Sequence, residues 1–148
     1  MPINLKLVNR KINLINRDLK SLRKIENISL KKFLAESDYE TLAERYLERI
    51  IGRMIDINYH ILSEENDYTP TDYYNSFTDM GKKNYLPVQL ARSLANSAGL
   101  RNRLAHEYDE IDEEKIYQAV KKCLNEVPQY IKHIIKFLDK FSKQKRMI

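Results

Sequence analysis

The sequence contains few of the residues that interrupt helices or cross-link small folds. Among its 148 residues are three glycines, four prolines, one cysteine and no tryptophan. Scarce Gly and Pro argue against a turn-rich β fold, and abundant Leu, Ile, Lys and Glu favour helices. A single cysteine excludes an intramolecular disulfide and suits a reducing cytoplasm. We therefore expect an all-α cytoplasmic protein.

Long apolar runs and clustered metal ligands are also missing. No segment approaches the roughly 20 apolar residues that a membrane span needs, so we expect no membrane association. The three histidines, His60, His106 and His133, are isolated, and no set of Cys, His or carboxylate residues has ligand spacing. We expect neither a metal nor another cofactor. Cys123 lies in a helical apolar pattern, where a buried small hydrophobe is favoured over a nucleophile.

Charge is unevenly distributed along the chain, although the net charge is only +5. Residues 1–32 hold nine Lys or Arg against two acidic residues, and residues 121–148 hold eight against two. Residues 33–120 carry an excess of acidic side chains. Basic helical ends could attract the phosphates of a nucleic acid. Solvated helix faces are the simpler interpretation, and charge alone leaves both open.

Apolar periodicity predicts about five helices in a single domain over residues 1–148. A heptad pattern from Leu5 to Leu22 indicates a long first helix. Residues 42–62 are apolar on more than one face, which is typical of a central helix or of one that also buries a dimer interface. Shorter patterns cover residues 73–80 and the segment from Pro87, and a second heptad seam spans residues 116–141. We expect residues 143–148 to be a frayed tail.

Four residues predict local features of these helices. Gly81 is interpreted as the C′ residue that ends the short helix. Gly99 lies in an apolar helical pattern, where it costs about 1 kcal/mol relative to Ala, so it predicts close helix packing or a bend. Asp112 is a suitable N-cap for the last helix. Pro128 lacks an amide donor and should kink or divide that helix.

Several polar residues of the second long helix are candidates for a supporting role. Arg45, Arg49 and Arg53 recur every four residues, and we favour surface ion pairs over phosphate contacts as the interpretation. Asp56 and His60 are four residues apart and share a face amid apolar neighbours. A buried Asp56 would need a partner, either His60 or a cation from another helix such as Arg101. We interpret this pair as supporting rather than catalytic.

The stretch richest in chemistry runs from Arg101 to Tyr108 and reads Arg-Asn-Arg-Leu-Ala-His-Glu-Tyr. An imidazole titrates near neutral pH and can take a proton from a ribose 2′-hydroxyl, while a guanidinium can stabilise charge on the adjacent phosphate. Such a pair is sufficient for metal-independent RNA cleavage. Alternatively, Arg103 and His106 only interact with the dipole at the end of a helix.

Helical geometry limits how this stretch can work. Asn102 and His106, four residues apart, share a face, whereas Arg101 and His106 are about 140° apart at 100° per residue. One straight helix therefore cannot direct Arg101 and His106 at the same phosphate. Either the helix breaks near His106, or a second copy completes the site across a two-fold axis.

The residues Arg101, His106 and Tyr108 match the Arg-X4-His-X-Tyr motif of HEPN proteins. The longer run from Gly99 to Asp112 resembles the HepT branch, the toxin partners of minimal nucleotidyltransferase antitoxins. The resemblance covers nearly the whole chain, from the long first helix to the final helix. It implies an up-and-down helical bundle that forms a homodimer with the two motifs facing each other and cleaves RNA as a toxin ribonuclease.

The resemblance also implies a role for each residue of the motif. Arg101 would bind and stabilise the scissile phosphate, His106 would act as general base or acid, and Asn102 would orient the phosphate or the histidine, with Arg103 near the phosphate. Tyr108 corresponds to the tyrosine that the nucleotidyltransferase partner modifies with AMP from ATP. The added phosphate would compete with RNA for the motif's cation.

Two functions are compatible with the sequence. The first is the toxin ribonuclease, and the alternative is a non-catalytic helical module that binds a nucleotidyltransferase and helps to position nucleotide or substrate. Acidic side chains surround the motif at positions 107, 109, 110 and 112–114, and they should repel an RNA backbone. They could instead face the nucleotidyltransferase, with RNA approaching along Arg92, Arg103 and the arginines of the second long helix.

Overall fold

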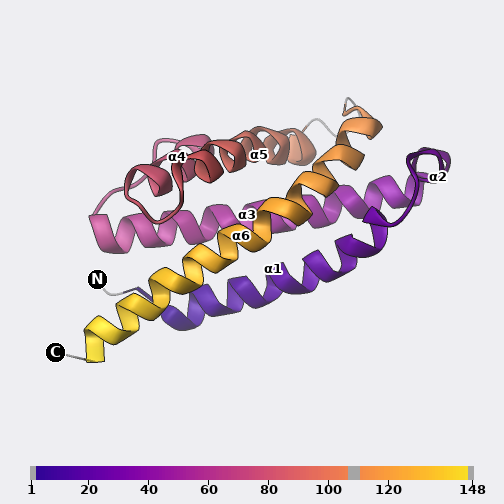
Figure 1. Cartoon of the computed structure of the whole chain (residues 1–148). Helices are drawn as coiled ribbons and strands as arrows, with labels where there is room; N and C mark the ends of the chain where they lie inside the picture. Colours follow the sequence, from indigo (N-terminus) through magenta and orange to yellow (C-terminus); the bar gives the residue numbers. More distant parts are fainter. Residues whose placement is uncertain (1–2, 107–110, 147–148) are drawn as a thin grey trace.

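A computed structural model describes residues 3–106 and 111–146 of the chain and shows six helices in that part (Figure 1). They are α1 (Leu5–Glu26), α2 (Leu30–Ala35), α3 (Ser37–Asn66), α4 (Tyr73–Lys82), α5 (Val88–His106) and α6 (Glu113–Arg146). No strand occurs in the described ranges. The predicted all-α fold is confirmed, with the one-and-a-half-turn α2 in addition to the five longer helices.

The long helix α3 is the centre of the bundle. It packs against each of the other five helices, whereas α1 contacts mainly α3 and α6, and α5 contacts mainly α4 and α3. Figure 1 shows α4 and α5 on the opposite side of α3 from α1. This central position explains why the apolar residues of α3 face several directions, among them the buried Ile50, Ile51, Met54, Ile55, Ile57 and Ile61.

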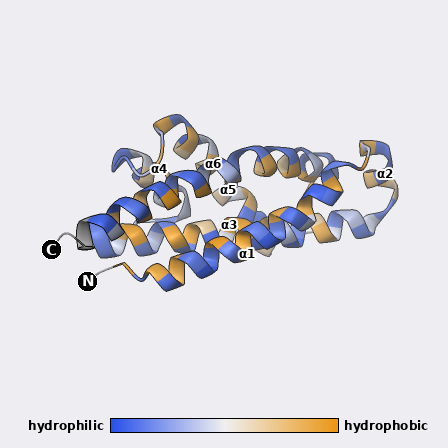
Figure 2. Ribbon diagram, turned by 60° about the horizontal axis from the view of Figure 1, so that its bottom comes forward, coloured by the Kyte–Doolittle hydropathy of each residue, from blue (hydrophilic) through white to orange (hydrophobic). Residues whose placement is uncertain are grey.

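One apolar core runs through all six helices. The heptad seam of α1 is buried as predicted, with Val8, Ile12, Ile15, Leu19 and Leu22 each at most 4% exposed. Figure 2 shows apolar residues along the neighbouring α1 and α3, with hydrophilic residues between them on each helix. Burying one Leu or Ile side chain contributes about 1.5–3 kcal/mol, so the seams account for the lengthwise packing of α1 against α3 and α6.

A buried polar chain joins α6 to α3 and α4. The hydroxyl of Tyr130 lies 2.6 Å from Asn58 Oδ1 and 3.1 Å from the Met54 carbonyl oxygen. The amide of Asn58 donates to Ser76 Oγ at 3.2 Å. Because all these groups are buried and paired, this series of hydrogen bonds fixes the register of α3, α4 and α6 without the cost of an unsatisfied polar atom.

The structure reverses the predictions for two glycines. Gly81 lies inside α4 and has no positive φ, so it is not a C′ residue; the turn beyond it is made by Asn84, whose φ is 65°. A Cβ at Gly81 would lie 2.8 Å from the Cβ of Ala91 in α5, so this glycine permits close helix contact. Gly99 is exposed, and a Cβ there would have nothing within 4 Å, so no described residue makes the expected close packing against it.

The last helix is longer and less interrupted than expected. α6 continues through Pro128, so this proline does not divide it. Buried neighbours on either side, Leu124 and Ile131, keep both halves against the core despite the missing amide. The helix also includes residues 143–146 of the predicted frayed tail, because no helix-breaking residue follows Pro128, while residues 147–148 lie outside the described ranges. The predicted cap is confirmed, since Asp112 Oδ1 accepts a hydrogen bond from the Glu114 amide at 2.9 Å.

Candidate active site

The helix α5 carries the described part of the motif in its last two turns. Small side chains hold it close to the bundle, and its buried residues are Leu90, Ala91, Leu94, Ala95, Ala98 and Leu104. The helix remains regular as far as His106. Arg101 and His106 therefore keep their separation of about 140° around the helix axis.

Arg101 is half-buried and directed toward α1, α3 and α4. Its guanidinium lies 5.5 Å from the ring centroid of Tyr73, an arrangement that contributes about 0.5–1 kcal/mol at an exposed site. The same side chain lines a hollow of about 280 Å³ together with Lys11, Glu48, Arg49, Gly52, Arg53 and Asp56. Within residues 3–106 and 111–146, Arg101 has no carboxylate partner, so its charge is available to an external anion.

The other motif residues do not line this hollow. Asn102 and Arg103 are exposed, and Arg103 borders a different cavity of about 240 Å³ among α3, α5 and α6. His106 is the exposed last residue of α5. Tyr108 and the acidic residues at 107, 109 and 110 lie outside the described residues. One chain therefore brings Arg101, but neither Arg103 nor His106, into the hollow.

Asp56 pairs with a cation from another helix, as one alternative predicted, but the predicted burial of Asp56 and its contact with His60 are wrong. Asp56 is 56% exposed rather than buried, and its Oδ2 pairs with Lys11 Nζ at 2.9 Å. His60 does not hold Asp56, because His60 Nε2 accepts a hydrogen bond from the backbone amide of Asn4 at 2.9 Å. Both partners come from the start of the chain, whose position the spacing within α3 could not indicate. Asp56 nevertheless lines the same hollow as Arg101.

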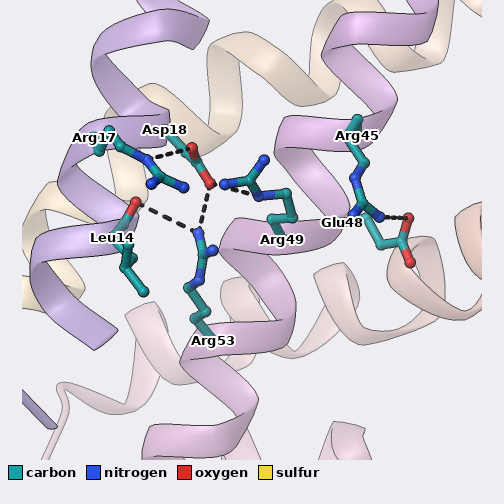
Figure 3. A network of polar contacts seen from close by, with 7 residues as sticks. All are labelled: Leu14, Arg17, Asp18, Arg45, Glu48, Arg49 and Arg53. Carbon is teal, nitrogen blue, oxygen red and sulfur yellow. Dashed lines mark hydrogen bonds and ion pairs between the residues drawn. The ribbon is translucent and has the colours of Figure 1, made fainter. Parts of the chain in front are cut away.

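The arginines of α3 surround a carboxylate that sequence reasoning missed (Figure 3). Asp18 of α1 is 2% exposed, and its Oδ2 lies 2.5 Å from Arg53 Nη1 and 3.1 Å from Arg49 Nε. Arg17 Nε adds a contact of 3.4 Å to Oδ1. Arg45 instead pairs with Glu48 at 3.8 Å. The preferred interpretation of the arginine stripe as ion pairs is thus confirmed, although its main partner is buried.

A signal for Asp18 was present in the sequence. Asp18 directly precedes Leu19 of the heptad seam, so it borders the face that α1 buries against α3. A carboxylate at such a position requires a cation from the facing helix. The four-residue repeat of arginines in α3 supplies that cation, and pairing the two patterns would have predicted the contact.

Three glutamates meet where the first turns of α3 and α6 approach each other. Glu40 and Glu44 of α3 lie near Glu113 of α6. Burial, repulsion by Glu113 and Glu44, and a hydrogen bond with Glu113 raise the pKa of Glu40 to about 7. Burial and Glu113 also raise the pKa of Glu44, whose Oε1 has no hydrogen-bond partner in the described part of the chain. This cluster lies at the start of α6, directly after the segment that contains Tyr108.

The cluster predicts that replacing Glu40 with glutamine changes the pH dependence of stability. A carboxyl with a raised folded-state pKa stabilises the fold below its unfolded pKa, near 4.5, and that contribution is lost as pH rises through about 7. Glu40→Gln should therefore match the parent near pH 4.5 and be more stable above pH 7, by about 0.5–1 kcal/mol after solvent screening. Thermal melts from pH 4 to 8.5 measure the difference, with Glu65→Gln as the exposed control on the same helix. A constant difference across this range would contradict the coupling.

Neither a metal centre nor a thiol nucleophile is formed by the described residues. Among residues 3–106 and 111–146, no three His, Cys, Asp or Glu side chains are placed to hold a metal ion. Burial, with a smaller contribution from nearby Glu126, raises the pKa of Cys123 to about 12. This thiol is neutral at physiological pH and is buried as predicted.

Comparison with known proteins decides the family. Residues 15–134 match the family described as "Ribonuclease HepT-like". The chain belongs to the HepT-like ribonuclease family. This HepT-like chain is also 38% identical over 132 residues to a tRNA nuclease HepT from Aphanizomenon flos-aquae, covering 89% of this chain and 90% of the relative. It is 29% identical over 85 residues to an mRNA nuclease HepT from Shewanella oneidensis, covering 57% and 64% of the two chains.

Solved structures of toxin–antitoxin complexes share the fold. The tri-AMPylated HEPN toxin of Shewanella oneidensis, in complex with MNT antitoxin, matches the HepT-like chain with a TM-score of 0.80 and 25% identity, over 88% of this chain and 97% of that one. A toxin–antitoxin structure with AMP-PNP matches with a TM-score of 0.81 at 24% identity, over 88% and 98%. The predicted resemblance to the HepT family is confirmed. No helix of the described part is long and apolar enough to cross a membrane.

Proposed function

We propose that this HepT-like chain is a cytoplasmic toxin that cleaves RNA without a metal, in a cleft between two copies of the chain. The observation that carries the proposal is Arg101, a half-buried cation without a carboxylate partner among the described residues, in a hollow rich in arginine. His106 leaves α5 on another side. A two-fold axis that brings the two motifs face to face would place Arg101 of one copy near the partner's His106.

The residues of the motif supply the chemistry of a transesterification. His106 takes the proton of a ribose 2′-hydroxyl, and the 2′-oxygen attacks the adjacent phosphorus. Arg101 stabilises the charge that develops on the phosphate oxygens. The bond to the 5′-oxygen breaks, and the imidazolium returns a proton to that leaving oxygen. The products are a 2′,3′-cyclic phosphate and a free 5′-hydroxyl, with no net change in protons.

Other predicted residues take supporting roles in this proposal. Asn102 shares the face of His106 and orients the imidazole or the phosphate, while Arg103 provides a further cation beside the motif. Asp56 holds Lys11 at the edge of the hollow through their 2.9 Å ion pair. His60 secures the start of α1 by accepting the Asn4 amide. Asp56 and His60 thus act on the shape of the site rather than on the substrate.

RNA cleavage by the purified protein tests the activity. We expect tRNA or mRNA to be degraded in the presence of EDTA, with cyclic phosphate ends on the products. A binding module without activity would form a complex with a nucleotidyltransferase and leave RNA intact, and that result would overturn the proposal of a catalyst. Analytical ultracentrifugation of the same sample measures the dimer, and a strictly monomeric active enzyme would exclude the shared cleft.

We also propose that a partner protein, a minimal nucleotidyltransferase, neutralises the toxin by transferring AMP from ATP to Tyr108. The added phosphate is negative and lies two residues from His106, so it would compete with RNA for Arg101. After incubation with partner and ATP, mass spectrometry should find AMP-sized increments on Tyr108. Tyr108→Phe should remain active under the same conditions. Increments on another tyrosine, such as the buried Tyr117, with Tyr108 unchanged would refute this step.

A further inference from the structure

The cations around the Arg101 hollow outnumber the carboxylates that can neutralise them. Six basic side chains lie in the hollow or in its ion pairs, namely Lys11, Arg17, Arg45, Arg49, Arg53 and Arg101. Three carboxylates face them: Asp18, Glu48 and Asp56. An excess of positive charge in a concave surface attracts anions, because the low-dielectric walls focus the field.

The ion pairs determine which of these cations are free to bind. Lys11 is paired with Asp56 at 2.9 Å, and Arg53 is held by Asp18 at 2.5 Å and is only 17% exposed. Arg49 differs from both, since its ion pair with Asp18 is made by Nε, at 3.1 Å, and the side chain is 30% exposed. Figure 3 shows Arg49 and Arg53 converging on the same Asp18 carboxylate. Neither terminal nitrogen of Arg49 has a partner among the described residues, so both can donate to a ligand.

The ion pair with Asp18 also restrains Arg49. An arginine that is restrained at Nε and extends its two terminal nitrogens in a plane can bind a phosphate or carboxylate bidentately, with less entropy lost than a free side chain would lose. Asp18 is buried and shared with Arg53, so this tether belongs to the α1–α3 contact rather than to a flexible surface. Arg101 reaches the same hollow from α5.

We infer that this hollow is a second phosphate site, in which Arg49 binds a backbone phosphodiester of the RNA strand adjoining the phosphate held by Arg101. The inference rests on the proposed ribonuclease function and extends it from the motif to the surface formed by α1 and α3. It assigns a substrate-binding role to a residue outside the motif. RNA would then reach the motif over the basic hollow, which lies on a different side of α5 from Arg103. Arg103 lines the separate cavity beside α6.

Salt-dependent RNA binding tests this site. The protein carries His106→Ala so that the probes stay intact, and the probes are two labelled single-stranded RNAs of equal length, an oligouridylate and a mixed sequence. Losing one phosphate contact lowers the slope of log K against log salt by about 0.7, which corresponds to about fivefold weaker binding at 0.1 M salt. We expect Arg49→Gln to show both changes, to the same extent with both RNAs, because a backbone contact does not read the sequence.

Arg23→Gln is the matched control. It removes the same charge from an exposed side chain of α1 that does not line the hollow and, among the described residues, pairs with no carboxylate that does. This variant should bind as the parent does. Equal losses in Arg23→Gln and Arg49→Gln would show a general charge effect and overturn the site, as would parental binding by a folded Arg49→Gln. If Arg49→Gln lowers the melting temperature, Arg49→Lys is used instead: it keeps the charge and the salt slope but loses the bidentate contact, so it should bind both RNAs more weakly than the parent, and parental binding would overturn the site.

The outcomes separate this inference from the function on which it rests. If the His106→Ala protein with Arg49 intact binds neither RNA, the proposed RNA substrate itself fails. If it binds both and Arg49→Gln binds equally well, only the second phosphate site fails. A third result, parental RNA binding with weaker binding of the nucleotidyltransferase, would assign the hollow to the protein partner and reject the RNA contact.

Discussion

Replacing His106 with alanine should lower the rate of RNA cleavage by at least about a hundredfold, because general acid–base catalysis by a positioned side chain contributes about 10²–10⁴ in rate. Arg101→Ala should cost about as much, since it removes the cation that stabilises the developing phosphate charge. Single-turnover cleavage at saturating enzyme measures the chemical step apart from binding. His133→Ala provides the control, because this half-buried histidine lies on α6, outside the Arg101 hollow.

Mixing the two inactive variants tests the shared cleft directly. In a heterodimer of Arg101→Ala and His106→Ala protomers, a site built from two copies retains one complete pair, an Arg101 from one protomer and a His106 from the other. An equilibrated equal mixture should therefore recover about a quarter of the parental activity, since half of the dimers are mixed and each has one working site. If each site used both residues of one chain, the mixture would remain as inactive as its components. Parental rates in either single variant would refute the catalytic assignment itself.

The sequence predicted the helices well because they depend on local patterns. Periodic apolar residues determine which face of α1 or α6 is buried, and the separation of Arg101 and His106 follows from helix geometry alone. What the sequence could not predict was which residues of different helices meet. Asp56 was expected to be buried within α3, yet it is exposed and paired with Lys11 of α1. Contacts of this kind depend on the packing of whole helices, which no single window of residues contains.

Asp18 illustrates the same limit from the other side. Its place beside the seam of α1 indicates a need for a cation from the facing helix, but its 2% exposure and its pairing with both Arg49 and Arg53 depend on how α1 packs against α3. Removing its charge would leave two arginines without their partner in a partly buried setting. The arginine repeat in α3 therefore serves the fold first. Of the two arginines that pair with Asp18, Arg49 is the one whose terminal nitrogens are available to a ligand.

The close approach of α4 and α5 at Gly81 leads to the largest expected change in stability. At Gly81, a Cβ would lie 2.8 Å from the Cβ of Ala91 and 3.5 Å from the Cα of Val88, and neither atom can rotate away. Gly81→Val should therefore force α4 and α5 apart and cost about 3 kcal/mol, equivalent to a fall of roughly 10 °C in Tm. Gly81→Ala should cost less, because better helix propensity returns about 1 kcal/mol. Thermal and urea unfolding measure both variants.

Gly99→Ala is the matched control on the neighbouring helix. Its added Cβ meets nothing within 4 Å, so the variant should gain about 1 kcal/mol of stability. Adding Ala91→Gly to Gly81→Ala should remove the clash between the two Cβ atoms and recover part of the lost stability. Such a recovery is expected if the clash causes the loss, and it is not expected if the loss comes from the backbone conformation at residue 81. A Gly81→Val protein as stable as the parent would contradict the close α4–α5 contact. The α4–α5 contact also positions Tyr73 of α4 beneath Arg101. Variants that separate the two helices should therefore lose RNA cleavage at temperatures where they remain folded.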